Sequence, residues 1–223
     1  MSKISVIVPA YKEGENLPSL VEDLEGAISD EFEIIIANDG NSDGSIEIIR
    51  NLEAKYNNVK GLFSLERRGK TKAIVEGFRN STGDIIVVMD ADLQYLPKDV
   101  PKLIKFLNQA DVVNGLRINR KDSVDRLIES KLYNSITRLF FNVDFNDSNS
   151  GLKVFKREVL NSIVPELRPG WHRFFLILAN KKGYNVIEKG VIHYPREKGL
   201  SKYTSPIKLL NGFMDLLTVK VSP

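Results

Sequence analysis

The sequence contains no cysteine and only two histidines among its 223 residues. The absence of cysteine excludes disulfide bonds and thiolate metal sites, and it agrees with a reducing compartment such as the cytosol. With so few histidines, zinc chemistry is not expected either. The 32 basic residues nearly balance the 29 acidic ones, which leaves a net charge of +3. So small an excess gives no reason to expect a nucleic acid as partner.

Long hydrophobic runs are also missing. The first residues, MSKISVIVPAY, hold a five-residue apolar run before Pro9, which is too short for a signal peptide. No apolar run approaches the roughly 20 residues that span a bilayer. The composition, 42% hydrophobic and 27% charged, is ordinary for a soluble protein, and the length suits one substantial core. We therefore expect a soluble, cytoplasmic protein with one domain.

Three motifs of common enzyme classes do not occur. The chain has no G-x-x-x-x-G-K-[ST] phosphate loop, no G-x-G-x-x-G after its first predicted strand and no G-x-S-x-G elbow. A P-loop enzyme and a Ser-His-Asp hydrolase are therefore not expected. One glycine-containing basic segment, RRGKTKA (67–73), places Gly69 and Lys70 at a predicted helix start. It is either a phosphate contact or a solvated basic helix end.

Apolar runs alternate with amphipathic stretches along the first half of the chain. Strands are predicted at 4–8, 32–37, 59–63 and 84–89, and helices at 16–28, 45–56 and 70–80. Nearly continuous apolar strands, each followed by a helix, are typical of βαβ units around a parallel sheet. After about Asn114 the alternation weakens. There we expect a helix at about 122–142, a turn-rich segment at 146–151, a helix at 173–183 and a strand at 185–194.

Four polar segments follow predicted strands. They are PAYKEGE (9–15), NDGNSDG (38–44), DADLQ (90–94) and NGLR (114–117), the last after the short strand DVV. Ligand sites of open parallel sheets lie outside the carboxyl ends of the strands. Because all four segments fall at one predicted edge, we expect an active site there.

The strongest single feature is the pair Asp90 and Asp92, directly after the apolar run IIVVM. Alternate residues of an extended segment point the same way, so both carboxylates could face one cation. Mg²⁺ and Mn²⁺ prefer oxygen ligands and typically combine one or two carboxylates with substrate phosphates. The alternative is that one of the two acids caps the helix predicted near Pro97.

Several segments together resemble one enzyme family. SVIVPAYKEGENL, IIIANDGNSDGS, ERRGKTKAIVEGFRNSTGDIIVVMDADLQYLP and DSNSGLKVFKRE are similar, in this order, to landmarks of family 2 glycosyltransferases. GWHRFFLILANKKGYNVIEKGVIHYPREKGLSKY resembles the polyprenyl-phosphate glycosyltransferases within it, the group of dolichol-phosphate mannose synthase and bactoprenol glucosyltransferase. The similarity runs from about residue 4 to 220.

The resemblance implies an α/β fold of the GT-A type, with a Rossmann-like, mostly parallel sheet flanked by helices and a C-terminal amphipathic helix. A single catalytic domain would cover 1–205, with a nucleotide-sugar-binding half at 1–117 and an acceptor-side half at 118–205. Residues 206–223 would form an amphipathic tail. The implied activity is metal-dependent transfer of a hexose, mannose or glucose, from a nucleotide-sugar to a polyprenyl phosphate, with inversion.

The family landmarks also imply site residues. Those assigned to the nucleotide-sugar are Pro9, Ala10, Tyr11, Glu13, Asp39, Lys70, Asp90, Ala91, Arg196, Ser201 and Lys202. Asp90, Asp92 and Gln94 would hold Mg²⁺ or Mn²⁺, which stabilises charge on the leaving nucleoside diphosphate. Asn38 departs from the family pattern, which usually has a further acid at this position before Asp39.

The implied catalytic residues are Asp92, Arg117 and Asp147. Arg117 suits bidentate contact with a phosphate. Asp147 matches the position of a candidate base or acceptor-orienting acid in related enzymes, and it is equally suited to an Asx turn beside Asn149 and Gly151. A phosphate acceptor is already ionised near neutral pH, so it needs little help from a base.

The expected partners are a nucleotide-sugar donor, GDP-mannose or UDP-glucose, a lipid-phosphate acceptor (dolichyl or undecaprenyl phosphate) and the membrane surface. At the end of the chain, Ile207, Leu210, Met214 and Leu217 form one helical apolar stripe. Such a stripe belongs either to an interfacial helix or to an ordinary docked terminal helix. Relatives often continue into transmembrane helices, and the sequence leaves open whether the native chain does. We expect a peripheral location at the cytoplasmic membrane face.

Two alternatives remain open from the sequence. The first is a family 2 enzyme whose acceptor is a sugar or protein hydroxyl, for which a base such as Asp147 would matter more. The second is a nucleotide-sugar-binding protein without turnover. The complete set of acids at 90–94 and the GLSKY loop favour an active enzyme over the second alternative.

Overall fold

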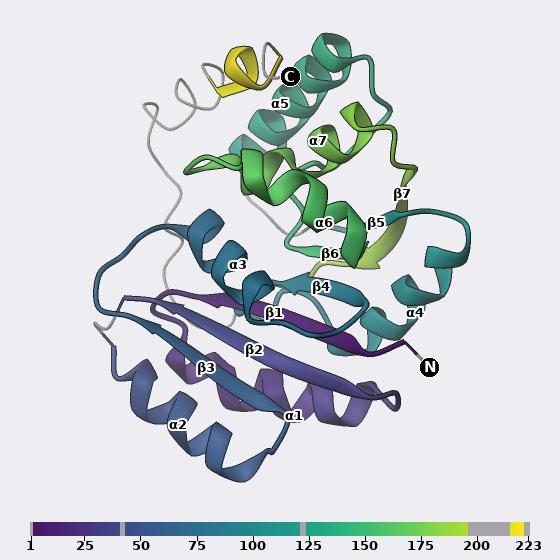
Figure 1. Cartoon of the computed structure of the whole chain (residues 1–223). Coiled ribbons are helices and arrows are strands. Elements are labelled where there is room, and N and C mark those ends of the chain that lie inside the picture. Colours follow the sequence, from purple (N-terminus) through teal and green to yellow (C-terminus); the bar gives the residue numbers. More distant parts are fainter. Residues whose placement is uncertain (1, 41–42, 121–123, 196–214, 221–223) are drawn as a thin grey trace.

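The strands of the described chain form one sheet at the centre of the structure (Figure 1). This computed structural model describes residues 2–40, 43–120, 124–195 and 215–220, with the backbone alone for 124–126. The strands are β1 (Ile4–Ala10), β2 (Phe32–Asp39), β3 (Val59–Ser64), β4 (Ile85–Met89), β5 (Val112–Ile118), β6 (Leu152–Lys156) and β7 (Val186–Ile192). Their spatial order is β3-β2-β1-β4-β6-β5-β7.

Most neighbouring strands run parallel. β1 pairs in parallel with β2 and β4, β2 with β3, and β5 with β7. β6 is antiparallel to both of its neighbours, β4 and β5. The carboxyl ends of all the other strands therefore meet at one edge, together with the start of β6. The predicted α/β class with a mostly parallel sheet is confirmed.

Helices cover both faces of this sheet (Figure 1). On one face lie α1 (Leu17–Ala27), α2 (Ser45–Lys55) and α4 (Val100–Ile104); on the other lie α3 (Lys70–Arg79), α5 (Val124–Phe141), α6 (Arg157–Ile163) and α7 (Phe175–Lys181). Short 3-10 turns are η1 (Gly14–Asn16), η2 (Pro97–Asp99), η3 (Lys105–Asn108), η4 (Val164–Glu166) and η5 (Trp171–Phe174). Two apolar cores result, one on each side of the sheet.

The apolar sequence pattern explains this layering. Strand residues alternate between the two cores, so that Val6 and Val8 pack with α1 while Ile7 faces α3. Helix α1 buries Leu20 and Leu24, which lie one turn apart on one face. Each such buried side chain contributes about 2 kcal/mol of transfer free energy, so the cores hold the polar edge of the sheet in a fixed shape.

Two features of the second half differ from the sequence expectation. Residues 114–117 do not follow a strand but lie within β5, which continues to Ile118, because β7 pairs with it along its whole length. Strand β6 and helix α6 were not predicted. In this strand the apolar residues Leu152 and Val154 stand on either side of Lys153. So short an alternation, directly after a turn-rich stretch, was not recognised as a strand.

The C-terminal part is described only at 215–220, where the chain is helical. Leu216 and Val219 are buried in the second core, whereas Leu217, the one described member of the predicted stripe, is 52% exposed. The predicted phosphate residues Arg196, Ser201 and Lys202 lie outside the described residues. Among the helices that are described, none is long and apolar enough to cross a bilayer.

Candidate active site

The acids after β4 lie at the carboxyl edge of the sheet, as predicted. Asp90 pairs with Lys70 at the start of α3, with 2.5 Å between Oδ1 and Nζ. Asp92 is 9% exposed, and its Oδ1 accepts a hydrogen bond from the backbone N–H of Gln94. Leu93, between them, has a φ of +57°, which costs a non-glycine residue about 1–2 kcal/mol. The tight turn thus brings Asp90, Asp92 and Gln94 together.

Gln94 joins this turn to the end of β7. Its Nε2 donates to the carbonyl of Tyr194 at 3.1 Å, and the N–H of Tyr194 donates to the carbonyl of Gln94 at 3.0 Å. These bonds fix the orientation of the Gln94 amide, because its nitrogen is already used as the donor to Tyr194. The oxygen Oε1 is therefore the Gln94 atom suited to a cation.

The loop before β6 packs directly against the acids. A Cβ on Gly151 would lie 2.4 Å from Oδ2 of Asp90, so only glycine fits there without a shift. The N–H of Gly151 donates to the hydroxyl of Tyr95 at 2.7 Å, and its carbonyl accepts from the N–H of Asp90 at 3.0 Å. The DADLQ turn and the turn-rich segment at 146–151 are therefore hydrogen-bonded to each other and closely packed.

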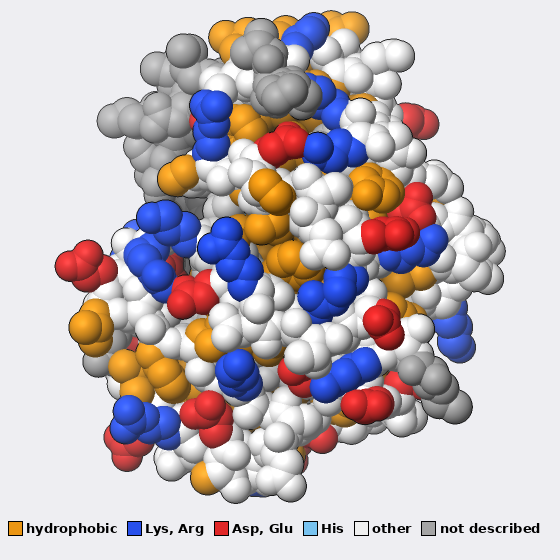
Figure 2. All heavy atoms as spheres, viewed as in Figure 1, with side chains coloured by type: hydrophobic (Ala, Val, Ile, Leu, Met, Phe, Trp, Pro, Cys, Tyr) orange, Lys and Arg blue, Asp and Glu red, His pale blue; other side chains and the backbone are white. Residues whose placement is uncertain are grey.

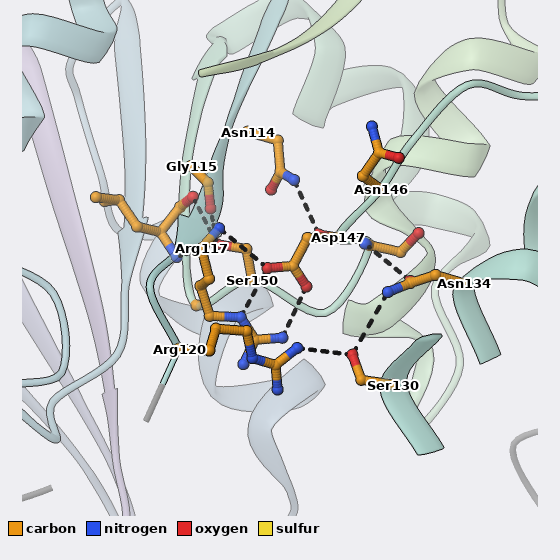
Figure 3. A network of polar contacts seen from close by, with 12 residues as sticks. Asn114, Gly115, Arg117, Arg120, Ser130, Asn134, Asn146, Asp147 and Ser150 are labelled. Carbon is orange, nitrogen blue, oxygen red and sulfur yellow. Dashed lines mark hydrogen bonds and ion pairs between the residues drawn. The ribbon is translucent and has the colours of Figure 1, made fainter. Parts of the chain in front are cut away.

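Asp147 in that loop holds Arg117 from β5 (Figure 3). Nε of Arg117 donates to Oδ2 and Nη2 donates to Oδ1, each at 2.7 Å, and the backbone N–H of Arg117 adds a bond of 3.2 Å. The side chain of Asp147 is 4% exposed and that of Arg117 is 13% exposed. Burial tends to raise the pKa of Asp147, but the hydrogen bonds and charge of Arg117 outweigh it and lower this pKa. A carboxylate held in this way is a poor proton acceptor.

Lys153, the second residue of β6, is a buried cation that sequence reasoning missed. It is 4% exposed and donates to the carbonyl of Ser150. Burial lowers the pKa of Lys153 to about 7, with Lys70 lowering it further and Asp147 and Asp90 opposing the shift. Asp147 and Asp90 thus both act electrostatically on Lys153.

A cleft of about 400 Å³ lies between the end of β5 and α5. Its lining includes Arg117, Arg120, Lys131, Arg138 and the carboxylate of Asp147. Figure 3 shows Arg120 beside Arg117, with Nη1 donating to Oγ of Ser130 on α5 at 2.8 Å. Four basic residues against one acid that is already paired give a cleft suited to an anion.

The predicted nucleotide side lies at the ends of β1 and β2. The ring of Tyr11 is covered by the guanidinium of Arg67, with Cζ 4.3 Å from the ring centroid. Asp39 is 5% exposed, and it accepts from the N–H groups of Arg68 and Gly69, which fixes the loop that leads into α3. Gly69 has a φ of +92°, which favours glycine there.

Other members of the predicted nucleotide set surround this loop. Glu13 is 8% exposed and accepts from Nδ2 of Asn16 at 2.8 Å, whereas Pro9 and Ala10 end β1 and Ala91 is buried. Both amide atoms of the buried Asn38 have no hydrogen-bond partner within the described part of the chain. An unpaired buried amide is costly, so this position is a candidate contact of a bound group.

Thr71 and His172 form a further contact near the site. Nδ1 of His172 lies 3.0 Å from Oγ1 of Thr71, and the N–H of His172 donates to the same hydroxyl. Burial and the neighbouring charges of Lys70, Arg173 and Lys153 place the pKa of His172 well below its ordinary value. His172 is therefore neutral and ties η5 to the start of α3.

The structure thus brings together the predicted residues Lys70, Asp90, Asp92, Gln94, Arg117 and Asp147. Among the described residues no three His, Cys, Asp or Glu side chains cluster as a complete protein-made metal site. The sequence assigned no role to Lys153, Tyr95 and Arg67, although each lies inside a segment quoted for the family resemblance. Their signal was this position inside a family-like segment, because none of them forms a motif alone.

Solved structures with a similar fold include glycosyltransferases. Glucosyl-3-phosphoglycerate synthase from Mycobacterium tuberculosis, in complex with Mn²⁺, uridine diphosphate and phosphoglyceric acid, matches with a TM-score of 0.74 at 20% identity, over 100% of this chain and 80% of that one. A mannosyltransferase from Pyrobaculum calidifontis, in complex with GDP-Man and Mn²⁺, matches with a TM-score of 0.66 at 19% identity, over 89% of this chain and 58% of that one. The fold is that of the GT-A glycosyltransferases.

The sequence comparison gives the family. The model of glycosyl transferase family 2 matches residues 5–164. Undecaprenyl-phosphate 4-deoxy-4-formamido-L-arabinose transferases from Photorhabdus laumondii and Pectobacterium atrosepticum are 36% and 35% identical, each over 98% of this chain. The chain belongs to glycosyltransferase family 2 and is an enzyme of that class. It spans about two thirds of these relatives, 68% and 67% of their lengths.

Proposed function

We propose that this enzyme transfers a sugar from a nucleotide-sugar to the phosphate of a polyprenyl lipid. The observation that carries the proposal is the position of Arg117. Its guanidinium is fixed by Asp147 at the mouth of a basic cleft, and the same loop packs on the acids after β4. The relatives named above, which are undecaprenyl-phosphate transferases, support the same acceptor class.

For the donor, we infer that the nucleotide lies over Tyr11 and Asp39 and its diphosphate near Lys70. The residues fit a divalent cation: Asp90 already attracts a cation in the ammonium of Lys70, and Asp92 and Oε1 of Gln94 add oxygen ligands. Two carboxylates and an amide suit Mg²⁺ or Mn²⁺ that completes its shell with phosphates. When bound, such a cation would stabilise charge on the leaving diphosphate.

For the acceptor, we infer that the lipid phosphate enters the cleft beside Arg117, Arg120 and Lys131. A phosphate oxygen attacks the anomeric carbon, a new C–O bond forms, and the bond from that carbon to the diphosphate oxygen breaks. The attacking oxygen is already ionised, so no residue has to remove a proton. Attack from the side opposite the leaving group would invert the anomeric centre.

Asp147 then acts as the group that orients Arg117. Both of its oxygens accept bonds from Arg117, and its lowered pKa opposes protonation. Replacing Asp147 by Asn would therefore impair transfer to a phosphate acceptor as well as to a hydroxyl acceptor. The acceptor class has to be identified from the product.

The outer surface of α5 supports a lipid acceptor. Ile128, Leu132 and Leu139 are 60%, 53% and 88% exposed, and their spacing puts them in one row along the helix. Lys131 and Arg138, which line the cleft, immediately precede two of them, so the basic row and the apolar row are neighbours. Figure 2 shows hydrophobic side chains at the top of the molecule, where Figure 1 places α5. We infer that this side faces the membrane surface.

The proposal is tested by incubating the protein with Mg²⁺ or Mn²⁺, undecaprenyl phosphate in detergent and a panel of labelled donors. The panel contains GDP-mannose, UDP-glucose and a nucleotide-linked 4-deoxy-4-formamido-L-arabinose, the sugar in the relatives' names. We expect one donor to give a metal-dependent labelled lipid. Transfer only to hydroxyl acceptors, or tight nucleotide binding without turnover under every condition, would contradict it.

A further inference from the structure

We propose that Glu188 on β7 is a positioning residue that fixes the Asp147–Arg117 pair for the acceptor phosphate. Glu188 lies beside the cleft rather than in its lining. It stands inside the family-like segment GWHRFFLILANKKGYNVIEKGVIHYPREKGLSKY, but the sequence assigned it no role. The inference rests on the proposed function insofar as the acceptor is a phosphate, but the geometry that it concerns is independent of any ligand.

The carboxylate of Glu188 accepts hydrogen bonds from the loop that carries Asp147. Oε1 accepts from the backbone N–H of Asp147 at 3.0 Å and from Nδ2 of Asn114 at 2.8 Å. Oε2 accepts from the backbone N–H of Asn146 at 2.7 Å and from its Nδ2 at 3.1 Å. Four donors occupy the roughly four acceptor positions of a carboxylate. Glu188 therefore has no capacity left for a substrate and acts through the loop alone.

Asn114 completes this anchor. Its Nδ2 donates to the carbonyl of Asp147 at 2.9 Å as well as to Glu188, so one amide joins β5, β7 and the loop. Asn114 and Glu188 face each other because they are register partners in the parallel pair β5 and β7. Arg117 lies three residues further along the same strand β5. The anchor thus sets where the Asp147 carboxylate meets the Arg117 guanidinium.

The need for such an anchor follows from the local structure. The loop lies between α5 and β6 and has no regular hydrogen-bonding pattern at Asn146 and Asp147. A bidentate pair needs both partners at a fixed distance and angle, and a small displacement lowers its value as a phosphate contact. Glu188 supplies the acceptors that the two N–H groups at 146 and 147 would otherwise lack.

The substitution Glu188→Gln tests this arrangement sharply. Because each oxygen of Glu188 accepts two donors, either orientation of the glutamine amide directs its NH₂ group at two other donors. Glu33→Gln is the matched control. Glu33 also accepts several hydrogen bonds, from Ser5 and Thr82, but at the opposite edge of the sheet, and all of them go to one oxygen. Asn114→Ala is a milder variant that removes one anchor.

The first measurement follows hydrogen exchange of the Arg117 Nε–H by NMR, with the resonance assigned through its loss in Arg117→Lys. We expect exchange to accelerate about tenfold or more in Glu188→Gln, less in Asn114→Ala and not in Glu33→Gln. Unchanged exchange in folded Glu188→Gln and Asn114→Ala would overturn the proposal, whether or not any acceptor binds.

The second measurement is the affinity for farnesyl phosphate, a short prenyl phosphate, and for a nucleoside diphosphate with Mn²⁺. We expect Glu188→Gln to weaken the binding of farnesyl phosphate about tenfold and to leave the affinity for the nucleotide unchanged. Equal weakening of both would overturn the positioning role. Wild-type protein that does not bind farnesyl phosphate would instead contradict the proposed acceptor, while the exchange measurement still decides the role of Glu188.

Discussion

The contact between Asp147 and Arg117 determines what each residue can contribute at the scale of single side chains. The sequence left three roles open for Asp147: a base, an acid that orients the acceptor, or a residue of an Asx turn. Its two oxygens accept both branches of the Arg117 guanidinium, which favours the orienting role. Fixing a guanidinium in advance lowers the entropy cost of binding a phosphate.

The lowered pKa of Asp147 has a consequence for stability. A carboxyl whose pKa is lower in the folded protein than its ordinary 3.8 stabilises the fold above that value. The contribution is lost as the pH falls through the lower, folded pKa. We expect urea unfolding between about pH 5 and pH 3 to show a steeper loss of free energy in the wild type than in Asp147→Asn. Parallel pH profiles for the two proteins would contradict the pairing.

Arg117→Lys keeps the charge and removes the fork that makes two parallel bonds. We expect kcat/KM for transfer to fall about 100-fold, because lysine cannot hold a phosphate bidentately. Arg138→Lys is the control in the same cleft: its guanidinium makes single bonds to Asn146 and Ser135. We expect an effect of about twofold there. Equal losses in both variants would indicate that the cleft recognises only total charge.

At the scale of elements, the site depends on one reversed strand. Because β6 is antiparallel to β4 and β5, its first residues rather than its last lie at the carboxyl edge of the sheet. The loop that carries Asp147 and Gly151 therefore meets the turn that carries Asp90. This meeting of two loops, far apart in sequence, positions the proposed acceptor cleft beside the predicted metal acids.

Gly151→Ala tests that meeting of loops. The new Cβ would lie 2.4 Å from Oδ2 of Asp90, so the carboxylate has to move. We expect metal-dependent binding of a nucleoside diphosphate, measured by calorimetry, to weaken about tenfold or more. Gly26→Ala on α1 is the control. A Cβ there meets nothing within 4 Å, and alanine in a helix stabilises it by up to about 1 kcal/mol. Unaltered metal-dependent nucleotide binding in Gly151→Ala would show that Asp90 is not a metal ligand.

The sequence predicted the first four strands and the helices between them because their apolar runs are long and regularly spaced. It missed β6 because the polar segment before it and Lys153 within it break the apolar pattern. Asp90, Asp92 and Arg117 were assigned to the site from the sequence because they stand in recognisable motifs. Glu188 and Lys153 were not, because their importance comes from hydrogen bonds and burial between strands that are distant in sequence.

At the scale of the whole molecule, the proposed donor and acceptor sides lie along one edge of the sheet. The proposed nucleotide side is at the ends of β1 and β2, and the cleft is between β5 and α5. The hydrocarbon chain of a bound lipid acceptor would extend out of the cleft along the apolar row of α5. Under the proposed function, a lipid phosphate would approach from the α5 side and the nucleotide-sugar would enter from the other.

Vesicle binding tests this orientation. Leu139 on α5 is 88% exposed and Leu65 after β3 is 87% exposed, so Leu139→Gln and Leu65→Gln form a matched pair. We expect Leu139→Gln to reduce partitioning onto phosphatidylglycerol vesicles about fivefold, since one leucine contributes at most about 2 kcal/mol when buried. Leu65→Gln should have no effect. Equal partitioning of both variants with the wild type would place the membrane on another side.

The central claim is that the acceptor atom is a phosphate oxygen. A ³¹P NMR spectrum of the reaction with farnesyl phosphate, Mg²⁺ and the active donor reports the acceptor monoester, the donor diphosphate and the product together. We predict that the monoester resonance is replaced by a phosphodiester whose shift no longer changes with pH near neutrality. Release of nucleoside diphosphate with the monoester resonance unchanged, and the sugar found on a hydroxyl, would contradict the account.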